Sequence, residues 1–221
     1  MTDARTGEEV TYWHSAVRRI LIVAAALCSL AAAVVVGWAM RHTAWGTAVE
    51  DAVASTVSEW RDGVWRLLRG GLGRVVPPLL VVAIPAGLVL THRRWGWRAA
   101  IFGALVTLGS NATVQAVKAG WVPFPDGAGP SGAPSLSGHV PLVMSAAVVA
   151  VLAAPALVRS RVAVVAVVAV MATAAGVVVS GWHTVGETVE PALVFLAWLC
   201  AAVATVVGWP GRTAHQGRSD R

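Results

Sequence analysis

The chain has 221 residues, of which 57% are apolar and only 13% are charged. In soluble domains about a quarter of the residues are charged, so this composition excludes an ordinary water-soluble globule. Apolar runs recur along the whole length, and no polar stretch between them is long enough for a second domain. We therefore expect one integral membrane domain of the all-α class.

The formal net charge of +6 does not indicate a nucleic-acid partner. A nucleic-acid interface needs a continuous basic face, whereas most cations here lie in short segments beside apolar runs, where they set membrane orientation. The two cysteines, Cys28 and Cys200, lie inside apolar runs. They indicate neither a disulfide framework nor a cysteine metal site.

Six apolar runs are each close to the roughly 20 residues that a helix needs to cross a bilayer. They are Ile20 to Met40, Val75 to Leu90, Ala99 to Val117, Val140 to Val158, Val162 to Val179 and Pro191 to Gly208. The predicted architecture is a six-helix membrane domain over residues 20–208. An N-terminal segment, 1–19, precedes it, and a polar tail, 209–221, follows it.

The arginines predict the orientation of these spans. Eleven of the 17 Lys and Arg residues precede the first span, follow the sixth, or lie between spans two and three or four and five. The positive-inside rule then places both termini in the cytoplasm and makes segments 41–74, 118–139 and 180–190 extracytoplasmic. Heavy use of Ala, Val, Gly and Arg favours a bacterial plasma membrane as the location.

The first extracytoplasmic segment has a helical pattern. Apolar residues recur at three- and four-residue steps from Val49 to Leu68, and charged residues from Glu50 to Arg66 occupy the other face. This pattern predicts an amphipathic helix that lies along the membrane surface or over the mouth of the bundle.

Polar groups at membrane depth are costly and therefore indicate functional positions. The third span carries Ser110, Asn111, Thr113 and Gln115 in its outer half and ends at Lys118, the only lysine in the chain. A flexible ammonium group at this place suits phosphate binding. The alternative is an accident of composition.

Ser137, Gly138 and His139 lead directly into the fourth span. Backbone amides at the start of a helix point outward with the positive end of the helix dipole, so these residues form a candidate anion cradle. The alternative is a plain turn with Ser137 as the N-cap.

His183 and Glu187 join the fifth and sixth spans and are four residues apart. On one helical turn the carboxylate can accept a hydrogen bond from the imidazole and set its tautomer. Oriented in this way, His183 is a candidate nucleophile, and His139 is a candidate proton donor to the leaving group. The alternative for each histidine is a structural role at the membrane interface.

These residues, in this order, resemble the type 2 phosphatidic acid phosphatase superfamily, the integral-membrane lipid phosphate phosphatases. The resemblance covers about half the chain, from the third span to the sixth. It implies six membrane helices with the site at the outer face. It also implies that His183 attacks phosphorus to form a phosphohistidine and that Glu187 stands where the family usually has Asp.

The same resemblance gives the remaining site residues their roles. His139 is then the general acid, and the phosphoryl oxygens are held by Lys118, Ser137 and the amide of Gly138. The family's scheme uses no metal and no cofactor. The implied substrate is a lipid phosphate that enters from the membrane surface.

The chain departs from the family motifs at three places. Phe124–Pro125 stands for Arg-Pro, Leu136 for Pro, and Gly176–Val177 for Ser-Arg. The two missing arginines are bidentate clamps for a phosphoryl group. Arg61, Arg66, Arg69 and Arg74 in the first extracytoplasmic segment are the candidates to supply a guanidinium instead.

The sequence therefore predicts a membrane phosphatase that hydrolyses a lipid phosphomonoester or diphosphate. The alternative is a catalytically impaired relative that binds lipid phosphate or acts as an interaction subunit. A small transporter is less favoured, because no ionisable residue is predicted near the bilayer midplane and no internal repeat is visible.

Overall fold

The computed structural model describes residues 4–122 and 136–207, with side chains for all of them except 4–15, 60–70, 72 and 207. These residues are almost entirely helical and contain no strand, which confirms the predicted all-α class. The elements are α1 (Ala4–His42), α2 (Ala44–Gly70), the π-helical turn η1 (Gly71–Val75), α3 (Val76–Trp95), α4 (Trp97–Lys118), α5 (His139–Ala153), α6 (Arg159–Val179) and α7 (Val185–Val207).

Within the described ranges, five helical stretches are long and apolar enough to cross a membrane. They lie in α1, in η1 and α3, in α4, in α6 and in α7. The chain is thus a multi-pass helical membrane protein. The predicted tail, 209–221, and the motif position Phe124–Pro125 lie outside the described residues.

Helix α5 is shorter than the predicted span Val140 to Val158. It ends at Ala153 because Pro155 follows closely and Ala154 adopts an extended conformation with ψ of 140°, as residues before proline usually do. Its 15 residues correspond to a length of about 22 Å, less than the roughly 30 Å thickness of a bilayer core.

Helix α7 starts earlier than the predicted span Pro191 to Gly208. It begins at Val185, so that Glu187 and Glu190 belong to the helix and Pro191 lies inside it. Hydropathy alone did not predict this start, because two carboxylates in one helical turn look unfavourable at membrane depth. In the structure each of them has a polar partner.

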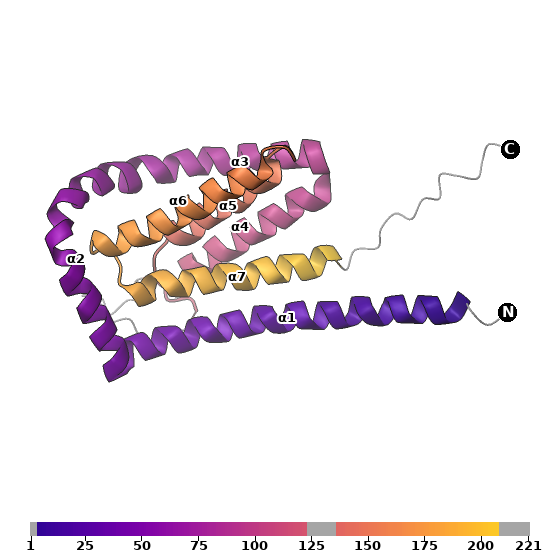
Figure 1. Cartoon of the computed structure of the whole chain (residues 1–221), viewed down its shortest axis with the longest axis horizontal. Helices are drawn as coiled ribbons and strands as arrows, with labels where there is room; N and C mark the ends of the chain where they lie inside the picture. Colours follow the sequence, from indigo (N-terminus) through magenta and orange to yellow (C-terminus); the bar gives the residue numbers. More distant parts are fainter. Residues whose placement is uncertain (1–3, 123–135, 208–221) are drawn as a thin grey trace.

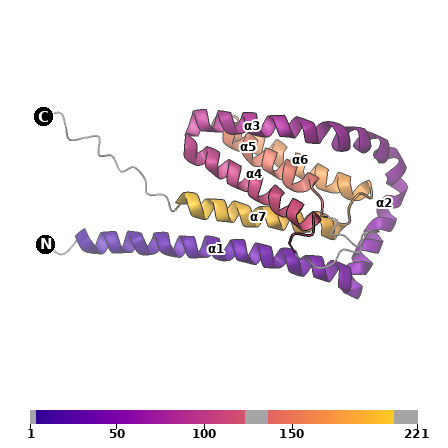
Figure 2. The same ribbon diagram turned by 180° about the vertical axis from the view of Figure 1, so that it is seen from behind.

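The helices form a bundle in which α7 is central. It packs on α1, α4, α5 and α6, and its Val194 and Phe195 belong to two buried apolar clusters that reach α1, α4 and α5. α1 begins and α7 ends at one end of the bundle, as Figures 1 and 2 show. The end of α4, the start of α5 and the connection from α6 to α7 lie together at the other end.

Helix α2 crosses this second end of the bundle, between the end of α1 and the start of α3 (Figure 1). The turn into it is tight: a Cβ atom at Gly46 would lie within 2.2 Å of the Ala39 carbonyl oxygen. Only glycine fits there without a shift of the backbone. Helix α2 then continues through η1 into α3.

A buried ion pair joins α1 to α7. Arg41 Nη2 lies 2.8 Å from Glu190 Oε1, and the side chains are 10% and 0% exposed. Gly37 makes room for the pair, because a Cβ atom there would lie 2.8 Å from both Arg41 Nη1 and Glu190 Cδ. The pair fixes the N-terminal part of α7 against α1 within this bundle.

Candidate functional site

The start of α7 positions the predicted nucleophile. Thr184 and Glu187 bond reciprocally: the Thr184 amide donates to Glu187 Oε2 at 3.1 Å, and the Glu187 amide donates to Thr184 Oγ1 at 3.3 Å. This is a capping box, which satisfies two backbone donors that a helix start leaves unpaired. The cap holds the Glu187 carboxylate in one orientation.

The same carboxylate contacts His183. His183 Nδ1 lies 3.3 Å from Glu187 Oε2. When Nδ1 carries the proton it donates to this carboxylate, and the lone pair is then on Nε2. The geometry is therefore the one that a nucleophilic imidazole requires, with an acidic residue that sets its tautomer.

Pro191 connects α7 to the start of α5. A proline has no N–H, so the Glu187 carbonyl, four residues earlier, lacks the usual helical donor. The Ser137 amide donates to this carbonyl instead, at 2.9 Å. This bond joins the segment before His139 to the helix turn that carries Glu187.

Ser137 does not cap α5. Gly138 is the N-cap residue, and no side chain of the described part of the chain bonds to the first amides of the helix. The Ser137 side chain is fully buried, and its Oγ has no hydrogen-bond partner among the described residues. The start of α5 therefore presents amides that no side chain of 4–122 or 136–207 caps.

Lys118 and Gln115, from the last turn of α4, lie over this helix start. A Cβ atom at Gly138 would lie 3.4 Å from Gln115 Nε2 and 4.0 Å from Lys118 Nζ. Both groups therefore lie within ordinary contact distance of the helix start. The arrangement of amides, ammonium and helix dipole suits an anion.

His139 precedes the predicted span Val140 to Val158 and lies close to Lys118 and His183. Burial lowers the pKa of His139, and the positive charges of His183 and Lys118 lower it further. Its ring packs on Trp182, with ring centroids 5.5 Å apart. A bound phosphate would offset these positive charges and favour the protonated imidazole that a general acid needs.

The structure therefore brings the six predicted site residues to one end of the bundle. Lys118 ends α4, Ser137 and Gly138 precede α5, His139 begins α5, and His183 and Glu187 flank the start of α7. Among the described residues, no group of three or more His, Cys, Asp or Glu side chains forms an arrangement that could hold a metal ion.

Two of the positions where the family has other motif residues are apolar and buried in this chain. Leu136 and Val177 are both fully buried. Arg74 is exposed, and the side chains of Arg61, Arg66 and Arg69 are outside the described set. Arg41 is already paired with Glu190. Among the described side chains, Lys118 is thus the cation that lies beside the start of α5.

Two residues of this region were not singled out as site residues from the sequence. Trp182 packs on His139 and also lies over η1, where a Cβ atom at Gly73 would be 3.1 Å from its Cη2. Glu50, from α2, accepts hydrogen bonds from the amides of Val185 and Gly186 at 2.9 and 2.8 Å. The carboxylate of Glu50 thus already occupies the anion-binding start of α7.

We expect replacement of Glu50 by alanine to destabilise the fold by about 1–2 kcal/mol, because it removes an anionic cap from a helix start. SDS titration followed by circular dichroism measures this change. Asp51→Ala is the matched control, since Asp51 is the neighbouring acid on α2 and is exposed. Equal effects of the two substitutions would contradict a capping role for Glu50.

No protein-family model matches the chain, and neither a curated protein nor a solved structure matches it.

Proposed function

We propose that the chain is a membrane phosphatase of the lipid phosphate phosphatase type, which hydrolyses a phosphomonoester or diphosphate on a lipid. The observation that carries the proposal is the meeting of His183, His139 and Lys118 at one end of the bundle, beside the start of α5, whose first amides no described side chain caps. These groups supply a nucleophile, a proton donor and an anion-binding place.

The proposed reaction has two steps. His183 Nε2 attacks phosphorus, the bond from phosphorus to the lipid oxygen breaks, and His139 transfers a proton to that oxygen. Water then attacks the phosphohistidine, His139 takes a proton from the water, and phosphate leaves as His183 is restored. The phosphoryl oxygens are held in both steps by Lys118, the Ser137 hydroxyl and the Gly138 amide. Negative charge develops on these oxygens in the transition state, and its stabilisation lowers the barrier to phosphoryl transfer.

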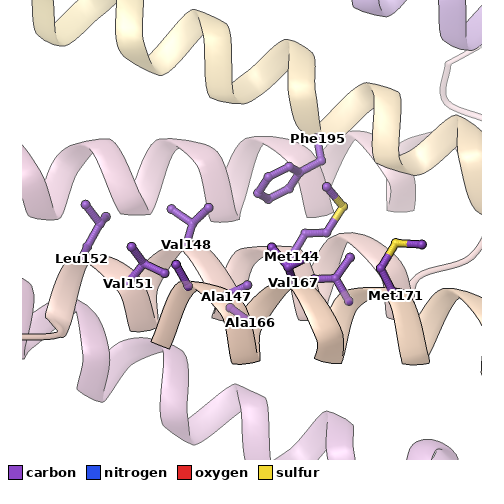
Figure 3. Close-up of a pocket in the computed structure, with 11 residues that line it drawn as sticks. Met144, Ala147, Val148, Val151, Leu152, Ala166, Val167, Met171 and Phe195 are labelled. Atoms are coloured by element: carbon purple, nitrogen blue, oxygen red, sulfur yellow. The ribbon is translucent and has the colours of Figure 1, made fainter. Parts of the chain in front are cut away.

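An apolar groove beside the site supports a lipid as the substrate. The groove has a volume of about 340 Å³ and lies between α5, α6 and α7. Figure 3 shows Phe195 of α7 pointing toward Met144 and Val148 of α5. Met144 is five residues after His139 in the same helix, so the near end of the groove lies about 7.5 Å from His139 along the helix axis, on a different face of α5.

The proposed setting is a bacterial plasma membrane with both termini in the cytoplasm and the site at the outer face. The arginines at the other end of the bundle support this orientation. Helix α2 then lies at the outer surface as an amphipathic helix, across the mouth of a bundle in which α5 is a sixth, shorter membrane segment.

A second candidate function is binding of lipid phosphate without hydrolysis. One observation favours it: Val177 is buried in the core at the position where the family has a phosphate-clamping arginine. At about 3 kcal/mol for each preorganised donor, losing two arginines costs several orders of magnitude in rate. The phosphate affinity then depends on Lys118 and the amides of α5.

Phosphate release by purified protein distinguishes the two functions. We expect turnover of short-chain lipid phosphates in detergent with a chelator present, and a loss of about 100-fold on replacing Lys118 by methionine. Arg18→Met is the matched control, because it removes a cation from the exposed face of α1.

Absence of turnover over a broad panel, with vanadate binding that depends on Lys118, would replace the phosphatase by the binding protein. Absence of both turnover and vanadate binding would contradict both functions.

A further inference from the structure

Three polar side chains lie on one face of α4 near its end. Asn111, Gln115 and Lys118 are spaced by four and three residues, so successive members are neighbours on the helix surface. Thr113 belongs to another face, because its Oγ1 accepts a hydrogen bond from Trp198 Nε1 of α7 at 2.9 Å. The face with Asn111, Gln115 and Lys118 is directed at α5 instead.

Asn111 holds this face of α4 against α5. Its Nδ2 donates to Ser145 Oγ of α5 at 3.0 Å and to the Thr107 carbonyl of its own helix at 2.8 Å. Asn111 lies seven residues before Lys118, which is about two helical turns. Ser145 lies the same number of residues after Gly138. The bond between the two helices therefore sets the end of α4 level with the start of α5.

Gln115 reaches the start of α5 together with Lys118. A Cβ atom at Gly138 would lie 3.4 Å from Gln115 Nε2, closer than the 4.0 Å to Lys118 Nζ. Among the described residues, the Gln115 side chain makes no hydrogen bond. Its amide group is thus a free donor at the place where the ammonium group lies.

The polar groups that meet at this place are hydrogen-bond donors. Gln115 presents Nε2, Lys118 presents Nζ, and the first turn of α5 presents amides that no described side chain caps. Ser137, next to Gly138, adds a fully buried hydroxyl without a partner in residues 4–122 and 136–207. Such a group of donors needs an acceptor. A phosphoryl group, with several acceptor oxygens, can accept from all of them.

We propose that Gln115 is a further phosphate-binding residue and that its Nε2 donates to a phosphoryl oxygen beside Lys118. This assignment rests on the proposed function, whether the bound lipid phosphate is hydrolysed or only held. The neutral amide supplies part of what the family's arginines supply, but a guanidinium is the stronger, bidentate donor. Asn111 is then a positioning residue, because it acts through the alignment of α4 with α5.

Vanadate binding by the purified full chain in detergent tests the contact. Gln115→Leu keeps a side chain of similar size and removes the donor, and we expect about tenfold weaker binding. Gln115→Glu directs a carboxylate at the anion, and we expect a loss of about 100-fold. Because Gln115 is exposed, neither change disturbs packed residues, and circular dichroism checks that both variants are folded.

Each of these variants has a matched control. Thr113→Val removes a polar group from the face of α4 that contacts α7, and Ala54→Glu adds one negative charge at an exposed position of α2, at the same end of the bundle. We expect both to leave the vanadate affinity unchanged within about twofold. If either control weakened binding as much as its Gln115 counterpart, the assignment of Gln115 would be overturned.

A third variant is expected to strengthen binding. Gln115→Arg places a guanidinium beside Lys118, and we expect vanadate to bind about tenfold more tightly than to the wild type. A folded Gln115→Arg that binds vanadate no better than Gln115→Leu would overturn the contact. Vanadate binding by the wild type that all three Gln115 variants retain unchanged would overturn this assignment alone. A wild type with neither vanadate binding nor phosphate release would overturn the proposed function as well.

Discussion

Replacement of His183 by asparagine is expected to lower the rate of phosphate release by about three orders of magnitude or more, as loss of a nucleophile does in other enzymes. Asparagine keeps a polar side chain near Glu187 but has no imidazole nitrogen to attack phosphorus. The loss is expected in kcat, because Lys118 and the start of α5 still bind the headgroup. Phosphate release under saturating lipid phosphate measures this change.

The matched control is His42→Asn, because His42 is an exposed histidine at the same end of the bundle. We expect it to leave the rate unchanged. Rapid quenching of the wild type with ³²P-labelled substrate should also give an acid-labile, base-stable phosphoprotein that the asparagine variant lacks. Equal rates for wild type and the His183 variant would contradict the phosphohistidine step.

The proximity of the candidate site residues could be predicted from the sequence because these residues lie at the ends of the predicted spans. Once six runs are placed, alternation of the chain across the membrane puts the connection after Lys118 and the connection at His183 on one side. The four-residue spacing of His183 and Glu187 then predicts a contact between them, and a contact of 3.3 Å is present. The local spacing and the alternation of the chain across the membrane therefore explain why the proximity of these residues could be predicted.

The parts that were not predicted depend on partners that are far apart in the sequence. Glu50 and Val185 are 135 residues apart, and Arg41 and Glu190 are 149 apart. No periodicity relates such pairs. The start of α7 was misplaced in part for this reason, since the Glu190 carboxylate is stabilised by the distant Arg41. The end of α5 was misplaced because hydropathy continues through Pro155, whereas helix geometry does not.

The packing around α7 explains why one helix turn serves both the fold and the site. Glu187 contacts His183 through its carboxylate and Ser137 through its carbonyl. One turn later, Glu190 is paired with Arg41 of α1. A displacement of this turn would therefore separate His183 from the start of α5. Stability of the α1–α7 pair and activity at the site are expected to change together.

Replacement of Arg41 by methionine is accordingly expected to lower the free energy of unfolding by about 3–5 kcal/mol, because it leaves the buried Glu190 carboxylate without its cation. The double variant Arg41→Met/Glu190→Leu should recover most of this loss, since two apolar side chains replace the pair without leaving a buried charge. Steric trapping in bicelles or SDS titration measures both changes.

Arg161→Met is the matched control for this pair, because Arg161 is an exposed arginine in the first turn of α6. Its effect should stay within about 0.5 kcal/mol. If Arg41→Met were no more destabilising than Arg161→Met, the ion pair would not fix α7 against α1. If the double variant were as unstable as Arg41→Met, the loss of stability would come from packing around Gly37 rather than from an unpaired carboxylate. The expected parallel loss of activity would then have no electrostatic cause.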